Sequence, residues 1–201
     1  FTNAMRDIIY GDTNSGINRI VQVLLIATAI GLGTALASGL STLLGFPPLN
    51  VAAVEHPLII QCLSAFLGCI GFSILFNIHG FGCIICALGG ALAWFAYGIT
   101  FKITHDVIIA SFFGTLVASA FSETMARVRK YPAISYLVIS IFPLLPGAGI
   151  YYTTVYLMNS HMTNFASKGG QTIGIAGALA VGILTVSTLV RLIVSRKRAM
   201  R

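Results

Sequence analysis

The chain has 201 residues, of which 57% are hydrophobic and only 8% are charged, and its mean hydropathy is +0.92. Soluble domains carry roughly 25% charged residues, so this chain could not cover a surface that faces water. The sequence therefore predicts an all-α integral membrane protein, because helices satisfy their own backbone groups in lipid. Its net charge of +7 comes from basic residues beside apolar runs, which is typical of membrane orientation and argues against nucleic-acid binding.

Six apolar runs are long enough to cross a bilayer, which takes about 20 residues per helix. The predicted spans are 20–46, 58–76, 82–99, 107–124, 133–158 and 170–194. Pro47 and Pro48 end the first span, a turn over residues 77–80 follows the second, and Pro132 begins the fifth. Residues 164–170 are predicted to form a short polar loop.

Lysine and arginine are distributed unevenly between the two sides that these spans define. One side would hold Arg6, Arg19, Arg127, Arg129, Lys130, Arg191, Arg196, Lys197, Arg198 and Arg201, and the other would hold Lys102 and Lys168. Because basic residues accumulate on the cytoplasmic side, both termini are predicted to be cytoplasmic, in the plasma membrane.

The most informative segment is IFPLLPGAGIYYTT, residues 141–154, in the middle of the fifth span. Pro143 and Pro146 each remove a backbone donor, and Gly147 and Gly149 loosen the same turn. A helix broken at membrane depth is tolerated only against protein or a water-filled cavity. The amides from Gly147 to Gly149 would then form a helix N-terminus suited to a substrate carboxylate.

Hydroxyl groups near this break complete a candidate substrate site. The predicted site comprises Ser140, Pro143, Pro146, Gly147, Gly149, Tyr151, Tyr152 and Thr153. The alternative is a structural proline kink that binds no ligand.

Glu123 is an ionisable residue near the cytoplasmic end of the fourth span, where such residues are often functional. We expect it to carry a coupling proton. The alternative is an interfacial glutamate paired with Arg127, since residues four apart on a helix are neighbours.

Other residue classes give no functional signal. Cys62, Cys69, Cys83 and Cys86 lie in or beside apolar runs, so we expect them to pack between helices rather than to bind metal. The four histidines fall in predicted connections and receive no role. The sequence contains no enzymatic or nucleotide-binding motif, and we predict neither catalysis nor a cofactor. In the last span, Gly170, Gly174, Ala178 and Gly182 recur at four-residue spacing, which favours close helix packing.

Taken together, four segments resemble the threonine/serine exporter family. GFSILFNIHG, SETMARVRK, YPAISYLVISIFPLLPGAGIYY and the glycine-rich last span resemble the family's smaller, five-span module. RDIIYGDTNSGINRIVQVLLIATAIGLG resembles the end of its larger module. The resemblance implies that residues 1–46 are the end of the larger module and residues 47–201 the small module. The rest of the larger module would then be missing upstream, as the absent initiator methionine also suggests.

The resemblance also implies secondary active export of a small polar metabolite, such as threonine, serine or a related carboxylic acid. Proton or potential coupling is expected, with membrane lipid, the upstream module and further copies of the chain as partners. The alternative is a non-catalytic membrane scaffold or assembly subunit of a transporter complex. A broken, hydrated helix distinguishes the two, because a scaffold does not need one.

Overall fold

The computed structural model describes residues 56–199 apart from residues 79 and 159, together with isolated positions between residues 13 and 45. The described elements are α3 (Leu58–Leu75), α4 (Phe81–Thr104), α5 (Val107–Arg129), α6 (Ala133–Ser140), the 3-10 turn η1 (Phe142–Leu144), α7 (Gly147–Met158) and α8 (Met162–Ala199). No strand occurs among them, which confirms the predicted all-α class. The predicted span 20–46 lies largely outside the described residues.

Internal packing divides the chain into two compact units. Unit 1 comprises residues 1–52 and 150–166, and unit 2 comprises residues 53–149 and 167–201. Most of the described helices belong to unit 2, whereas unit 1 contains the greater part of α7 and the first turn of α8.

Four helices in the described part of the chain are long and apolar enough to span a membrane, namely α3, α4, α5 and α8. The segments Ala133–Leu144 and Gly147–Leu157 together form a further candidate, bent by 52°. These five agree with the last five predicted spans, so the chain is a multi-pass membrane protein.

The prediction of a loop over residues 164–170 is wrong, because these residues are helical and belong to α8. Lys168 Nζ donates to Gln171 Oε1 at 3.1 Å, and Thr172 Oγ1 donates to the Lys168 carbonyl at 2.7 Å. The segment contains no proline, and each glycine costs a helix only about 1 kcal/mol. Its polar residues therefore extend the helix instead of ending it.

The helix ends in unit 2 are set by single residues. Asn77, His105 and Lys130 have φ values of 60°, 54° and 57°, a left-handed conformation that stops a helix. Asp106 starts α5 by accepting hydrogen bonds from the amides of Ile108 and Ile109 at 2.7 and 3.2 Å. The predicted turn after the second span is confirmed at Asn77 and at Gly80, whose φ is 66°.

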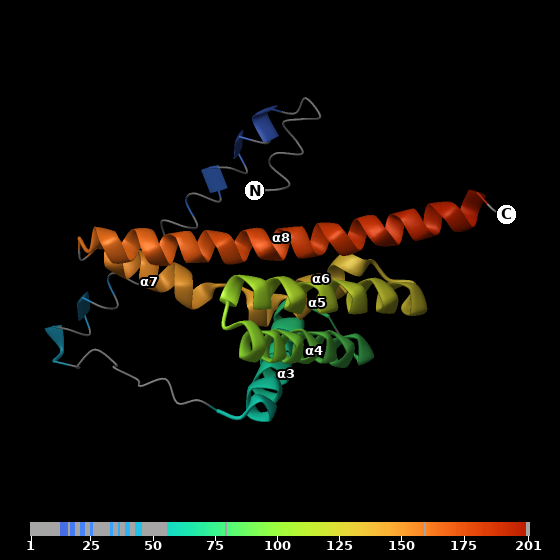
Figure 1. Cartoon of the computed structure of the whole chain (residues 1–201), viewed down its shortest axis with the longest axis horizontal. Coiled ribbons are helices and arrows are strands. Elements are labelled where there is room, and N and C mark those ends of the chain that lie inside the picture. The colour runs from blue at the N-terminus through green and yellow to red at the C-terminus, as the bar shows by residue number, and fades with distance from the viewer. Residues whose placement is uncertain are drawn as a thin grey trace. The chain divides into compact units, whose positions relative to one another are not determined.

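Small residues let α4 pack closely against three neighbours. A Cβ on Gly90 would collide with Sγ of Cys69 on α3, and a Cβ on Gly89 would collide with Oγ of Ser140 on α6. On α5, a Cβ on Gly114 would lie 3.0 Å from the Ala93 carbonyl oxygen of α4. As a result α3, α4, α5 and α6 form one bundle around α4 (Figure 1).

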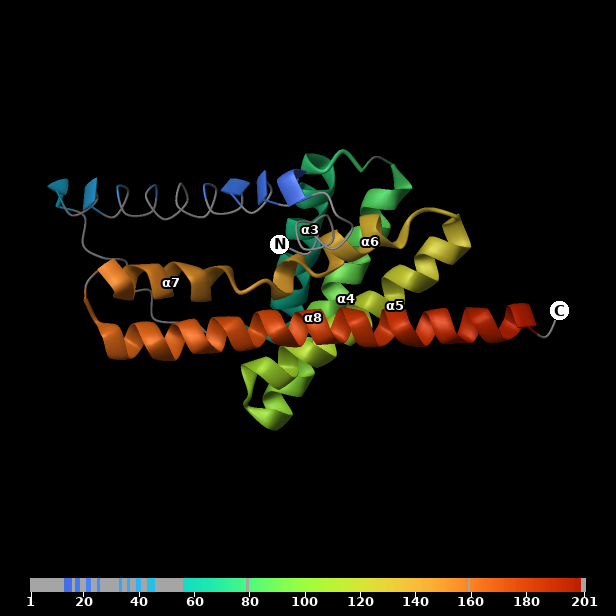
Figure 2. The same ribbon diagram turned by 90° about the horizontal axis from the view of Figure 1, so that it is seen from above.

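The part of α8 in unit 2 packs on α5. A Cβ on Gly174 would lie 2.6 Å from Ile108 Cδ1, and one on Gly182 would lie 3.0 Å from Thr115 Cβ. Figure 2 shows α8 running across α5. The predicted close packing is confirmed at Gly174 and Gly182, whereas Gly170 has no atom within 4 Å of the Cβ position.

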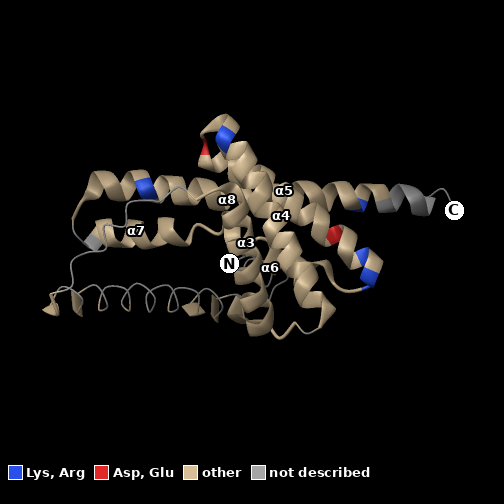
Figure 3. Ribbon diagram, turned by 90° about the horizontal axis from the view of Figure 1, so that it is seen from below, with Lys and Arg blue, Asp and Glu red and all other residues tan. Residues whose placement is uncertain are grey.

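Charged residues in unit 2 lie toward the ends of its helices. Arg127, Arg129 and Lys130 lie at the end of α5, where the Arg129 guanidinium is 5.6 Å from the centre of the Phe81 ring at the start of α4. Lys102 lies at the opposite end of α4, in its last turn. Figure 3 shows uncharged helix between these groups, as expected for elements that cross lipid.

Candidate functional site

The predicted break in the fifth span is present and follows from its two prolines. After α6 ends at Ser140, the chain makes the short turn η1 and resumes as α7 at Gly147. Leu145 is extended, with φ −63° and ψ 133°, because a residue before proline avoids the helical region. Eight residues of α6 and twelve of α7 flank the break, or about 12 and 18 Å at 1.5 Å per residue. The break therefore lies near the middle of the span.

The first half of the break is anchored in unit 2. Ser140 is fully buried against Gly89, and Pro143 lies beside Gly90, with its Cγ 3.5 Å from the Cβ position of that glycine. The Phe142 ring stacks on Phe72 of α3, with centroids 3.6 Å apart. These contacts fix the turn against α3 and α4, so the bend is part of the packed core.

A cavity of about 320 Å³ lies beside this anchored half. It is open on one side and mainly apolar, and its lining includes Pro143 from the break, Ile60, Gln61, Ser64 and Ala65 from α3, and Trp94 from α4. Of the predicted site residues, Pro143 is the one that lines it. A small amino or carboxylic acid is well within the volume of this cavity. The structure thus provides space for a ligand beside the broken helix.

The second half of the break differs from expectation in one respect. The Gly147 amide donates to the Leu145 carbonyl at 2.8 Å, across Pro146. The prediction that this amide would be free is therefore wrong, because the tight turn at Pro146 brings a carbonyl within reach. A Cβ on Gly147 would meet open space, whereas one on Gly149 would lie 2.5 Å from Oγ1 of Thr172 on α8.

The predicted hydroxyl donors do not all gather at the break. Ser140 Oγ is buried and has no hydrogen-bond partner among the described residues. Tyr151, Tyr152 and Thr153 follow on the part of α7 that belongs to unit 1. Tyr151 and Tyr152 pack edge to face with ring centroids 5.4 Å apart, and both are exposed. Their role in substrate binding stays a prediction.

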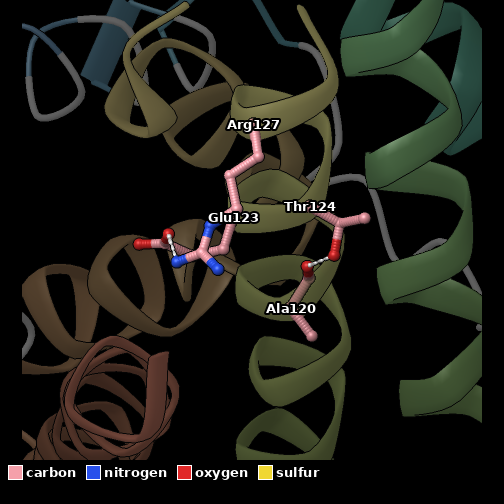
Figure 4. A network of polar contacts seen from close by, with 4 residues as sticks. All are labelled: Ala120, Glu123, Thr124 and Arg127. Carbon is pink, nitrogen blue, oxygen red and sulfur yellow. Dashed lines mark hydrogen bonds and ion pairs between the residues drawn. The ribbon is translucent and has the colours of Figure 1, made fainter. Parts of the chain in front are cut away.

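Glu123 lies on α5 one turn before Arg127, and its Oε2 is 3.7 Å from the Arg127 guanidinium (Figure 4). The glutamate side chain is 26% exposed and the arginine side chain 49% exposed. Both alternatives for this residue remain open: the pairing agrees with an interfacial glutamate, and the partial exposure leaves the carboxylate accessible to protons. Next to it, Thr124 Oγ1 donates to the Ala120 carbonyl at 2.7 Å.

Gln61 and Trp94 were missed by the sequence analysis. Trp94 Nε1 donates to Gln61 Oε1 at 3.0 Å, and Gln61 Nε2 donates to the His56 carbonyl at 2.8 Å. Both residues line the cavity beside Pro143. A polar amide inside an apolar span was the available signal, because such a side chain in lipid requires a partner.

The cysteines of α3 and α4 behave as packing residues, as predicted. Cys69 and Cys86 are 1% and 0% exposed, and all four cysteines are free thiols. Among the described residues, no three metal-ligating side chains come together.

The sequence was compared with known proteins. Residues 61–189, more than half of the chain, match the family model described as a threonine/serine exporter. Residues 1–41 match a second family model, also described as a threonine/serine exporter. None of the curated proteins and none of the solved structures matches the chain.

Proposed function

Since the chain belongs to the threonine/serine exporter family, we propose that it exports a small polar metabolite with a carboxylate group by secondary active transport. Threonine and serine are the first substrates to test, and other small carboxylic acids follow. The transport is driven by protons or by the membrane potential. This is a transporter family, and we propose no enzymatic activity.

The proposal rests on one observation, which is that the span formed by α6 and α7 is broken near its middle, beside a cavity. The 52° bend lies between two segments that together are long enough to cross a membrane, and Pro143 of the bend lines a cavity of about 320 Å³. Discontinuous helices with a cavity at the bilayer midplane are characteristic of secondary transporters. We place the substrate at this break, with Pro146, Gly147 and Gly149 closing the second side.

Among the residues of the described helices, Glu123 is the one with an acidic side chain. We propose that its carboxylate carries the coupling proton and that Arg127 holds it in place between cycles. Placing an acidic side chain in a membrane span costs free energy, so a functional role is the default expectation for such a residue.

The orientation and the modular organisation are also proposals. We place both termini and the end of α5 in the cytoplasm of a plasma-membrane exporter, because Arg127, Arg129 and Lys130 cluster there. We assign residues 1–46 to the end of a larger module and residues 47–201 to the small module. The separate matches of residues 1–41 and 61–189 support this assignment. The remainder of the larger module and further copies of the chain would be the protein partners.

The competing function is a membrane scaffold or assembly subunit whose partner binds the substrate. Such a subunit would pack on its partner without needing a hollow beside a broken helix. The cavity beside Pro143 favours the exporter.

Counterflow in vesicles tests the proposal. The full chain is reconstituted into vesicles loaded with unlabelled threonine, serine or succinate, and uptake of the labelled compound is followed. An exporter accumulates the label transiently and saturably. Absence of counterflow with every compound would support the scaffold, and unsaturable flux would indicate a channel.

A further inference from the structure

A second, larger hollow adjoins the cavity beside the break. It has a volume of about 800 Å³ and lies along α3 and α4, from Lys102 and His105 at the end of α4 to Gln61 and Trp94. Trp94 is ten residues before the last residue of α4, Thr104, which corresponds to about 15 Å along the helix. This is half of a hydrocarbon core of about 30 Å. The groove therefore extends from the end of α4 along half a membrane thickness of that helix to the hollow beside the break.

Four aromatic rings line this groove as a continuous ladder on α4. The Trp94 and Tyr97 centroids are 5.0 Å apart, those of Tyr97 and Phe101 6.0 Å, and those of Phe101 and His105 6.3 Å. Ring faces attract an ammonium group and repel a carboxylate, because the face of the π system is negative.

A cation lies at the mouth of the groove. Lys102 lines it, and no carboxylate among the described residues forms an ion pair with it. Asp106 lies nearby in the chain but accepts hydrogen bonds from the first amides of α5. Lys102 is thus available to a carboxylate that arrives from outside.

Gln61 and Trp94 lie where the two hollows meet. Both residues line the inner cavity and the outer groove, and the hydrogen bond between them joins α3 to α4 at 3.0 Å. The Gln61 amide is also held by the His56 carbonyl at 2.8 Å. This pair is consequently held in place at the boundary between the hollow beside the break and the groove that runs to the end of α4.

We propose that the outer groove is a second binding site for a zwitterionic amino acid. The amino acid would occupy this site while it moves between the break and the non-cytoplasmic side. Lys102 binds the carboxylate, and the aromatic ladder binds the ammonium group. The Gln61–Trp94 pair lies between this site and the hollow beside the break. A dicarboxylate fits less well, because its second carboxylate would face the rings. The assignment rests on the proposed export function for its direction, but the binding itself does not.

The test uses the one tryptophan of the chain, because Trp94 lies where the two hollows meet and reports on the groove directly. The purified full chain in lipid nanodiscs is titrated with threonine, and with succinate as the dicarboxylate, while its emission is recorded. We expect a saturable change with threonine and none with succinate. Lys102→Gln should raise the half-saturating concentration by about ten- to a hundredfold, the effect of losing one hydrogen bond to a charged group.

Matched variants make the outcome decisive. Lys102→Arg keeps the charge and should retain binding, and Lys168→Gln removes a cation outside the groove and should change nothing. The proposal would be overturned if Trp94 emission did not change on addition of threonine, or if Lys102→Gln left the half-saturating threonine concentration unchanged. Counterflow measured on the same purified protein, reconstituted into loaded vesicles, separates the two claims. If the protein transports threonine but Trp94 emission does not change, only the proposed binding in the groove is refuted. If Trp94 emission changes but no transport occurs, binding in the groove is supported and the export function is contradicted.

Discussion

The indole Nε1 of Trp94 donates a hydrogen bond to Oε1 of Gln61 at 3.0 Å, which joins the middle of α4 to the first turn of α3. The two residues are 33 positions apart in the chain. Their contact joins the α3–α4 pair next to the broken helix.

Gln61→Met should destabilise the protein, because it leaves the Trp94 N–H without an acceptor inside the membrane. We expect a loss of about 0.6–1.7 kcal/mol, the average and the maximum found in double-mutant cycles for hydrogen bonds between membrane helices. Thermal unfolding in detergent measures it. In a double-mutant cycle with Trp94→Phe the two losses should be less than additive, and simple additivity would show that the bond contributes nothing.

Gly90→Ala should destabilise unit 2 by about 1–3 kcal/mol, the usual cost of overpacking. Its Cβ would collide with the Cys69 thiol, which is 1% exposed and contacts the Ile139 carbonyl at 3.5 Å. Cys69→Ala should relieve the loss in the double variant. Gly71→Ala on α3 is the matched control, since nothing lies within 4 Å of that position. Equal unfolding midpoints for Gly90→Ala and Gly71→Ala would contradict the packing account.

Pro146→Ala should abolish transport while leaving the protein inserted and folded, because a continuous helix is at least as stable in lipid as a broken one. Tyr151→Phe should cause a smaller loss, mainly in apparent affinity, of about tenfold or more. Counterflow with labelled threonine measures both. Wild-type transport by Pro146→Ala would remove the break from the mechanism.

Gly149→Leu should also abolish transport, and here the structure adds a control. A side chain at this position meets Thr172 of α8, so the loss could arise from packing alone. Gly149→Ala combined with Thr172→Ala separates the two causes. If close packing is the only requirement, the double variant recovers transport, whereas a substrate site at Gly149 keeps it inactive.

Glu123→Gln should remove the dependence of transport on a pH gradient, since the amide cannot carry a proton. Arg127→Gln breaks the same ion pair but keeps the carboxylate, so it should retain that dependence. Neither variant should lower stability by more than about 1 kcal/mol, because the pair is partly exposed. Transport that keeps its wild-type gradient dependence in Glu123→Gln would make the glutamate purely structural.

A cysteine placed at position 130 in a chain without its native cysteines should react only with membrane-permeant thiol reagents in intact cells. The predicted orientation puts Lys130 in the cytoplasm with the other basic residues at the end of α5. Position 102 is the control and should react with impermeant reagents. Labelling of position 130 by an impermeant reagent would show that the orientation is opposite to the one predicted.

Much of the fold was determined by the sequence alone, because in lipid each helix satisfies its own backbone and apolar length defines it. The α3 helix at Leu58–Leu75 and the break at Pro143 and Pro146 follow from local chemistry. The segment 164–170 did not follow, since polar residues and glycines permit both loop and helix and neighbouring hydrogen bonds decide between them.

Only the tertiary structure decided which polar groups meet. The three- and four-residue spacing of Trp94, Tyr97, Phe101 and His105 places these rings on one face of α4. Nothing local in the sequence relates Gln61 to Trp94 or predicts that α3 lies beside this face. Those relationships depend on the antiparallel register of α3 and α4, which is fixed by close contacts such as Gly90 with Cys69 and Gly98 with Leu58. A pattern along one helix records which face is apolar, but the partner opposite each residue is set by how two helices pack.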